Sequence, residues 1–196
     1  MNDIVAPDSA VHISVISGTN RAGSQTLRLS QHIAGLLRGL PGVQASVIDL
    51  QDLPEGLLAP TAYATKPPGF AAFSDAVLRS DGLLVVTPEY NGGMPGVLKV
   101  FIDLLPFPVA FERRPVAFVG VSSGRWGALR PVEQLQGVFG YRNAFMFPDR
   151  VFIPGVGGEL DAQGAPTSPL IAGLLSKQAA DFSSFCRLIR PLRPGA

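Results

Sequence analysis

The chain has 196 residues, a length that favours one domain over two and allows a sizeable core. Apolar residues make up 46% and charged residues 16%, which excludes disorder driven by charge repulsion. The net charge of +1 provides no broad basic surface for nucleic acid, so we expect a single domain over residues 1–196 with no nucleic-acid partner.

The hydrophobic pattern predicts five strands, each followed by a helix. Apolar runs rich in β-branched residues predict strands at residues 11–17, 43–50, 83–87 and 116–121, with one or two short pieces within 144–153. Amphipathic stretches predict helices at residues 24–40, 69–80, 95–105, 128–140 and 168–189. Pro95 is expected to be the first residue of the third helix, and residues 51–68 are expected to be irregular.

This alternation predicts an α/β fold with a parallel sheet and helices on both faces. Five strands suit the flavodoxin-like doubly wound form, with strand order 2-1-3-4-5. In such sheets ligands bind at the carboxyl ends of the strands. The loops after the first, third and fourth strands are therefore where chemistry is expected.

Neither a membrane span nor a secretory signal is expected. The longest uncharged run, residues 162–176, is interrupted by Pro166 and Pro169, whereas a spanning helix needs about 18 mainly apolar residues. The first twenty residues contain Asp3 and Asp8 but no Lys or Arg, so the charged start of a secretory signal is missing. We expect a cytoplasmic protein.

Cysteine and histidine are scarce in this sequence. Cys186 is the one cysteine, and its apolar helical context predicts a buried structural residue. His12 stands at a strand start and His32 within a helix, where structural roles are expected. No metal-ligand spacing is present in the sequence, and no metal ion is expected.

The loop after the first strand, residues 17–26, carries hydroxyl groups, an arginine and two glycines at the start of a helix. Free N–H groups and the positive end of the helix dipole favour an anion there. The hydroxyls of Thr19, Ser24 and Thr26 can donate hydrogen bonds, and Arg21 can add a charge-assisted one. The alternative is that Ser24 only caps the helix.

Two common nucleotide-binding motifs are incomplete in this loop, and their absence favours an anion with a single phosphate. Gly18 and Gly23 have the Walker A spacing, but Ser24 and Gln25 stand where that motif needs Lys and Ser or Thr. Asn20 occupies the second glycine position of the dinucleotide pattern G-x-G-x-x-G. A single phosphate monoester fits this loop best.

The loop after the third strand, residues 87–99, reads TPEYNGGMPGVLK. Its Pro and Gly residues fix the backbone so that peptide N–H groups can meet a flat polar heterocycle, while Tyr90 and Asn91 supply an aromatic face and an amide. The alternative is a turn whose tyrosine packs on its own helix.

The loop after the fourth strand contains the pattern G-x-S-x-G at residues 120–124. In α/β-hydrolases the histidine of the triad follows the serine in the chain, but His12 and His32 both precede Ser122. We therefore do not expect a serine hydrolase.

The loops at residues 18–26 and 87–99 resemble those of the NADPH-dependent FMN reductase family, and the resemblance extends over nearly the whole chain. This family of flavodoxin-like proteins includes chromate, quinone and azo-dye reductases. The resemblance implies that the first loop holds the FMN phosphate, the second holds the isoalloxazine and ribityl part, and the third lies beside the ring. The implied FMN-binding residues are Ser17, Thr19, Arg21, Ser24, Gln25 and Thr26, then Pro88, Glu89, Tyr90, Asn91 and Gly92, and finally Ser122, Ser123, Gly124 and Gly127.

The resemblance also implies an activity, an NAD(P)H-dependent reduction of FMN with NADPH or NADH as co-substrate. We expect hydride transfer to the flavin N5, followed by transfer of electrons to a small acceptor such as a quinone, chromate, an azo dye or free flavin. The cofactor carries this reaction, so no side chain is assigned as a catalytic acid, and peptide N–H groups of residues 88–92 and 122–124 are expected to stabilise the reduced ring. The alternative is a non-enzymatic FMN-binding electron carrier or redox sensor of the flavodoxin type.

Trp126 and Arg125 are the expected borders of the pocket for the nicotinamide and the acceptor. Arg21, Arg125 and Arg130 are possible partners for the 2′-phosphate of NADPH. The resemblance further implies a homodimer, with a homotetramer possible. Two departures from the family pattern, Val100 in place of an Asn and Leu104 in place of a common Trp, affect the helix that usually lies at the dimer interface.

Overall fold

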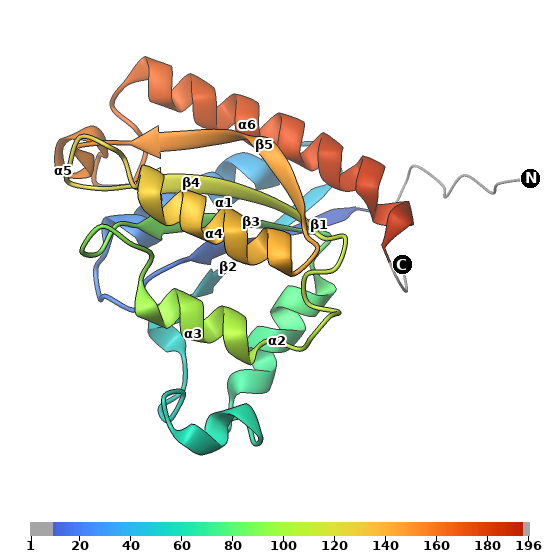
Figure 1. Ribbon diagram of the computed structural model, residues 1–196. Helices are drawn as coiled ribbons and strands as arrows, with labels where there is room; N and C mark the ends of the chain where they lie inside the picture. Colours follow the sequence, from blue (N-terminus) through green and yellow to red (C-terminus); the bar gives the residue numbers. More distant parts are fainter. Residues whose placement is uncertain (1–9, 194–196) are drawn as a thin grey trace, which may run out of the picture.

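A parallel sheet of five strands, with helices on both faces, forms the centre of the computed structural model, which describes residues 10–193 (Figure 1). The strand order is β2-β1-β3-β4-β5, as predicted, and all four neighbouring pairs are parallel. The strands are β1 Val11–Ser17, β2 Val43–Asp49, β3 Gly82–Pro88, β4 Pro115–Val121 and β5 Phe145–Ile153.

The helices follow the strands in alternation, with short 3₁₀ turns between them. The helices are α1 Gln25–Arg38, α2 Phe70–Arg79, α3 Gly96–Leu104, α4 Leu129–Tyr141, α5 Val156–Glu159 and α6 Pro169–Ile189. The 3₁₀ turns are η1 Leu50–Asp52, η2 Pro60–Tyr63 and η3 Arg190–Leu192. The predicted start of α3 was one residue early, because Pro95 has a ψ of 134° and serves as the N-cap.

β5 is one strand with an irregular register. Met146 pairs with Val116, but Arg150 pairs with Phe118, so the β5 side of the ladder contains extra residues. Pro148 lies in this stretch and has no N–H to donate to the neighbouring strand. This proline explains why the sequence pattern predicted one or two short strand pieces in place of one continuous strand.

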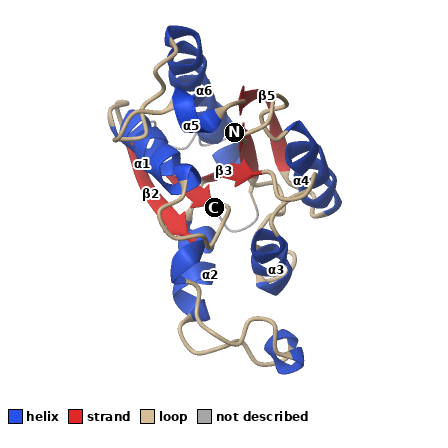
Figure 2. Cartoon of the chain, turned by 90° about the vertical axis from the view of Figure 1, so that its left-hand side faces the viewer, coloured by secondary structure: helices blue, strands red, loops and turns tan. Residues whose placement is uncertain are grey.

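Two hydrophobic cores lie on opposite faces of the sheet. Figure 2 shows the sheet between α1 and α6 on one side and α3 and α4 on the other. The side chains of Val15 and Leu84 belong to the core under α1 and α6, whereas those of Ile16 and Val85 belong to the core under α2, α3 and α4. Because both faces are covered, the central strands read as unbroken apolar runs.

Cys186 and His12 lie away from the carboxyl ends of the strands. Cys186 is fully buried in α6, as predicted, and its Sγ packs directly against Gly82, where a Cβ would overlap it. Burial raises the pKa of this thiol. His12 stands at the start of β1, with Nε2 3.2 Å from Ser46 Oγ. Burial lowers the pKa of His32 in α1.

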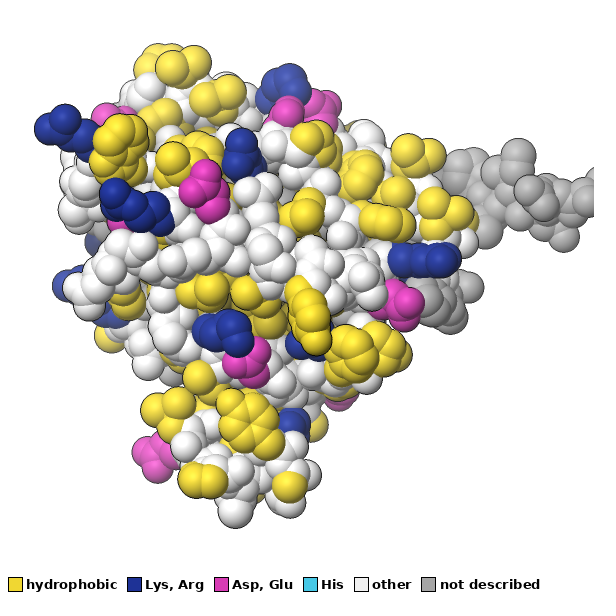
Figure 3. All heavy atoms as spheres, viewed as in Figure 1, with side chains coloured by type: hydrophobic (Ala, Val, Ile, Leu, Met, Phe, Trp, Pro, Cys, Tyr) yellow, Lys and Arg dark blue, Asp and Glu magenta, His cyan; other side chains and the backbone are white. Residues whose placement is uncertain are grey.

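Residues 50–68 form a lobe below α2 and α3 (Figure 1). Hydrophobic side chains are visible on its surface (Figure 3), and Leu58 and Tyr63 are 83% and 64% exposed. Between residues 10 and 193, no helix is both long enough and apolar enough to cross a membrane. Asp3 and Asp8 lie outside the described residues.

Candidate functional site

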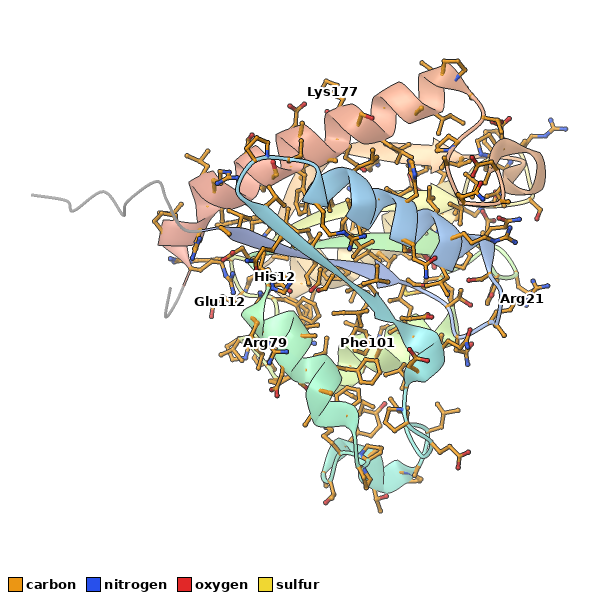
Figure 4. All side chains as sticks on the ribbon, turned by 180° about the vertical axis from the view of Figure 1, so that it is seen from behind. His12, Arg21, Arg79, Phe101, Glu112 and Lys177 are labelled. Carbon is orange, nitrogen blue, oxygen red and sulfur yellow. The ribbon has the colours of Figure 1, made fainter. Side chains whose placement is uncertain are left out.

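The three predicted loops meet at the carboxyl edge of the sheet, after β1, β3 and β4. Arg21 lies beyond this edge, and His12 lies at the opposite end of the sheet (Figure 4). Parallel pairing of neighbouring strands brings their carboxyl ends together, so residues from loops far apart in the chain share one site.

The first loop contains buried polar atoms that have no partner. Ser17 Oγ and Gln25 Oε1 are buried without a hydrogen bond to any of residues 10–193, and Ser17 is 0% exposed. Buried polar atoms are nearly always hydrogen-bonded, so two such atoms in one loop point to a polar ligand. Gly18 keeps the loop close to the sheet, because a Cβ there would lie 2.7 Å from the carbonyl oxygen of Val86.

The start of α1 is suited to an anion. Ser24 caps the helix, since its side chain accepts a hydrogen bond from the N–H of Leu27 at 3.1 Å. Capping uses a lone pair of the Ser24 hydroxyl and leaves its proton free to donate. The first turn contains no acidic residue, and the N–H groups of Gln25 and Thr26 have no acceptor within the helix. Ser24 therefore caps the helix, and this cap is compatible with phosphate binding.

The loop after β3 is a tight hairpin turn. Tyr90 and Gly93 exchange two backbone hydrogen bonds of 2.9 and 3.0 Å, and Asn91 and Gly92 between them have φ values of 51° and 77°. Two successive positive φ angles define a type I′ turn, for which Asn-Gly is the preferred pair. The backbone conformation explains these residue types without any reference to a ligand.

Helix α4 braces this loop from the side. Arg130 forms an ion pair with Glu89 at 3.3 Å, and Gln134 Oε1 accepts a hydrogen bond from the N–H of Met94 at 2.9 Å. Arg130 and Gln134 are four residues apart on one face of α4. The sequence did not predict that these two residues brace the loop after β3, and it suggested Arg130 only as a partner for a 2′-phosphate.

The first and second loops are joined by side chains. The hydroxyl oxygens of Thr19 and Tyr90 are 2.6 Å apart, and Thr19 is 1% exposed. Thr19 Oγ1 also accepts a hydrogen bond from the N–H of Arg21 at 3.2 Å, while the Arg21 side chain is exposed. Three of the predicted site residues are thus directly connected.

The loop after β4 is held by its own backbone and by glycine packing. Ser122 Oγ donates to the carbonyl of Gly124 at 2.8 Å, so it is engaged within the loop. A Cβ at Gly120 would overlap the carbonyl of Gly127, and one at Gly127 would lie 2.9 Å from Phe152 Cβ. Close packing therefore accounts for these glycines, and the hydrolase-like pattern has no catalytic geometry.

A cavity of about 580 Å³ lies between the lobe and α3, on the β2 side of Tyr90. It is lined by Asn20, Leu50, Gln51, Leu53, Pro54, Gly56, Leu57, Leu58, Ala59, Tyr90, Pro95, Gly96, Val97 and Val100. None of these side chains carries a charge. Trp126, 59% exposed, and Arg125, also exposed, lie in the loop after β4 and are not part of this lining.

Taken together, the residues fit FMN. A monophosphate would find donors at Ser17, at the start of α1 and at Arg21, and the turn at residues 90–93 lies beside them. Within residues 10–193, no group of three or more His, Cys, Asp or Glu side chains is placed to hold a metal ion.

The fold thus defines a flavodoxin-like protein, and the donors of its first loop fit a nucleotide monophosphate. The family model for NADPH-dependent FMN reductases matches residues 11–157, and the chain belongs to this family. It is accordingly an NAD(P)H-dependent oxidoreductase that uses FMN.

Known relatives cover most of the chain. An NAD(P)H-dependent FMN reductase of Pseudomonas aeruginosa is 31% identical over 185 residues, which is 89% of this chain and 95% of that protein. A 2-hydroxy-1,4-benzoquinone reductase of Burkholderia sp. is 32% identical over 79% of this chain and 85% of its own. The fold is also similar to that of the flavoenzyme FerB of Paracoccus denitrificans, with a TM-score of 0.77 and 24% identity over 91% of this chain and 98% of the other.

Proposed function

We propose that the protein binds FMN across its three loops and passes electrons from NAD(P)H to a small, neutral, flat acceptor such as a quinone. The observation that carries the site is the buried hydroxyl of Ser17, a donor without a partner, beside a helix start that contains no acid. When bound, FMN supplies the group that takes up hydride from NAD(P)H and hands the electrons on.

The roles of the residues follow from their positions. The phosphate is held by the buried hydroxyls, the start of α1 and the exposed Arg21. The second loop and the backbone of the third loop would hold the ribityl chain and the ring. In this assignment the phosphate residues are Ser17, Thr19, Arg21, Ser24, Gln25 and Thr26, and the ring residues are Pro88, Glu89, Tyr90, Asn91, Gly92, Ser122, Ser123, Gly124 and Gly127. Peptide N–H groups of the last two loops would supply hydrogen bonds to negative charge on the ring.

The acceptor class is supported by the cavity beside Tyr90. Its volume of about 580 Å³ and its uncharged, mainly apolar lining suit a neutral ring compound such as a quinone. Chromate and sulfonated azo dyes are charged and would lose hydration in this cavity without gaining a counter-charge. Two relatives that carry the name quinone reductase, both from Pseudomonas putida, support the same choice.

Trp126 and Arg125 are proposed to contact the NAD(P)H from the loop after β4. The indole of Trp126 is 59% exposed, so a dinucleotide can reach it. Replacing Trp126 with Ala should raise the KM for NADPH. Unchanged KM values for both NADPH and the acceptor would assign Trp126 to the surface alone.

We further propose that the protein works in the cytoplasm as a homodimer, or as a homotetramer built from such dimers. The exposed Leu58 and Tyr63 on the lobe supply apolar surface for such an interface. Sedimentation measurements on FMN-loaded protein test the assembly.

A colour test distinguishes the enzyme from an electron carrier. The purified protein should be yellow, and NADPH should bleach it anaerobically within one turnover. A yellow protein that NADPH cannot bleach would support the carrier alternative, and a colourless protein that fails to bind added FMN would overturn the proposal.

A further inference from the structure

Two hydroxyl groups form a short bridge between the first and second loops. Thr19 Oγ1 and the Tyr90 hydroxyl are 2.6 Å apart, with Thr19 1% exposed and Tyr90 37% exposed. Either oxygen can be the donor in this hydrogen bond. Thr19 belongs to the cradle, the loop that is predicted to hold the phosphate, whereas Tyr90 lines the cavity beside α3.

The protons of this bridge can be counted. A threonine hydroxyl has one proton and two lone pairs, and the N–H of Arg21 already donates to Thr19 Oγ1 at 3.2 Å. If Tyr90 donates to Thr19, both lone pairs are used and the Thr19 proton is free for a ligand in the cradle. If Thr19 donates to Tyr90, the cradle receives no proton from Thr19, and the Tyr90 proton is directed elsewhere.

We propose that a phosphate in the cradle selects the first arrangement, which makes Tyr90 a positioning residue that acts on the phosphate through Thr19. A phosphate group is negatively charged and accepts hydrogen bonds, so it requires the Thr19 proton. Donation from Tyr90 to Thr19 then polarises the Thr19 hydroxyl in the same direction and strengthens its bond to the phosphate.

The same arrangement sets the polarity of the cavity. With phosphate bound, the Tyr90 hydroxyl directs its hydrogen at Thr19 Oγ1 and presents only lone pairs to a ligand beside it. A molecule in the cavity then bonds to Tyr90 only through its own O–H or N–H group. Occupation of the cradle thereby determines what the neighbouring cavity can recognise.

The proposal rests on the proposed FMN site, and a comparison of FMN with riboflavin separates the two. Riboflavin lacks the phosphate, so the ratio of the two dissociation constants isolates the phosphate contribution. Tyr90→Phe keeps the ring and should reduce the preference for FMN about threefold to tenfold, the size expected for one net hydrogen bond. In a Thr19→Val background, the same change at Tyr90 should leave the ratio unaltered.

The outcomes are distinct. If the unaltered protein binds neither flavin, the proposed function fails. If it prefers FMN but Tyr90→Phe weakens the binding of FMN and of riboflavin equally, Tyr90 contacts the ring alone. The hydrogen bond between Thr19 and Tyr90 then has no effect on phosphate binding, and the proposal is overturned.

A second measurement observes the proton directly. The chain has three tyrosines, so a Tyr63→Phe/Tyr141→Phe variant leaves Tyr90 as the one reporter. The intensity ratio of the tyrosine doublet in the Raman spectrum distinguishes a phenol that donates from one that accepts. Inorganic phosphate added to the FMN-free variant should shift this ratio toward the donor form, and sodium chloride at equal ionic strength should not. An unchanged ratio at saturating phosphate would overturn the proposal, and adding Thr19→Val should abolish the shift.

Discussion

Replacing Ser17 with Ala should change stability and FMN affinity in opposite directions. Ser17 is fully buried at the end of β1, and its Oγ has no hydrogen-bond partner within residues 10–193. A buried hydroxyl without a partner costs about 1–3 kcal/mol. Removing it should stabilise the FMN-free protein by about 1 kcal/mol, which raises Tm by roughly 2–4 °C for a domain of this size.

Ser17→Ala should lower the affinity for FMN, although it raises the stability of the FMN-free protein. A hydrogen bond to a charged group contributes about 1.5–3 kcal/mol. Loss of the Ser17 hydroxyl should therefore weaken FMN binding by roughly tenfold to 150-fold, at about 1.4 kcal/mol per factor of ten. Titration of the FMN-free protein, followed by quenching of flavin fluorescence, measures this change.

The same substitution on the same strand provides the control. Ser14 is as buried as Ser17, but its Oγ lies 2.6 Å from Ser80 Oγ and 3.2 Å from Ser46 Oγ. Ser14→Ala should lower Tm and leave FMN affinity unchanged, because Ser14 lies in the middle of β1 and its hydroxyl bonds to Ser80 and Ser46, outside the site. If Ser17→Ala also lowers Tm and leaves FMN affinity intact, Ser17 is a structural residue and the assignment of the cradle is refuted.

Three further predictions concern the cradle and the core. Gly18→Ala should lower Tm of the FMN-free protein and weaken FMN binding, because its Cβ would lie 2.7 Å from the Val86 carbonyl; an unchanged Tm would contradict this. Arg21→Ala should weaken FMN binding without changing Tm, and because Arg21 is exposed, the loss of affinity should shrink at high salt. Arg38→Ala, at the far end of α1, is the control and should leave FMN affinity unchanged at low and at high salt. Cys186 should resist alkylation until the protein unfolds. Because the pKa of its thiol is raised in the folded state, its contribution to the free energy of unfolding should be complete below the ordinary thiol pKa. Above that pH the free energy of unfolding should fall by at most about 1.4 kcal/mol per pH unit. A Cys186→Ala variant should lack this alkaline slope, which denaturant titrations between neutral and alkaline pH can measure.

Some elements were predictable from local sequence because local physics determines them. β1 was predicted to the residue, since strands covered on both faces give unbroken apolar runs and a glycine follows at once. The helix predicted at residues 168–189 begins one residue later, at Pro169, because Ser168 is its N-cap. The four-residue α5 was missed because it is too short to show a helical period.

The sequence by itself predicted a phosphate-binding loop, because the hydroxyls, arginine and glycines of the first loop are neighbours along the chain. Only the tertiary structure decided how the site is assembled. The bond between Thr19 and Tyr90 joins positions 71 residues apart, and the pair of Arg130 with Glu89 spans 41. The cavity beside α3 likewise depends on how the lobe packs. Such contacts follow from strand order and helix packing, which bring distant loops to one edge of the sheet, and no local pattern encodes which side chains will then meet.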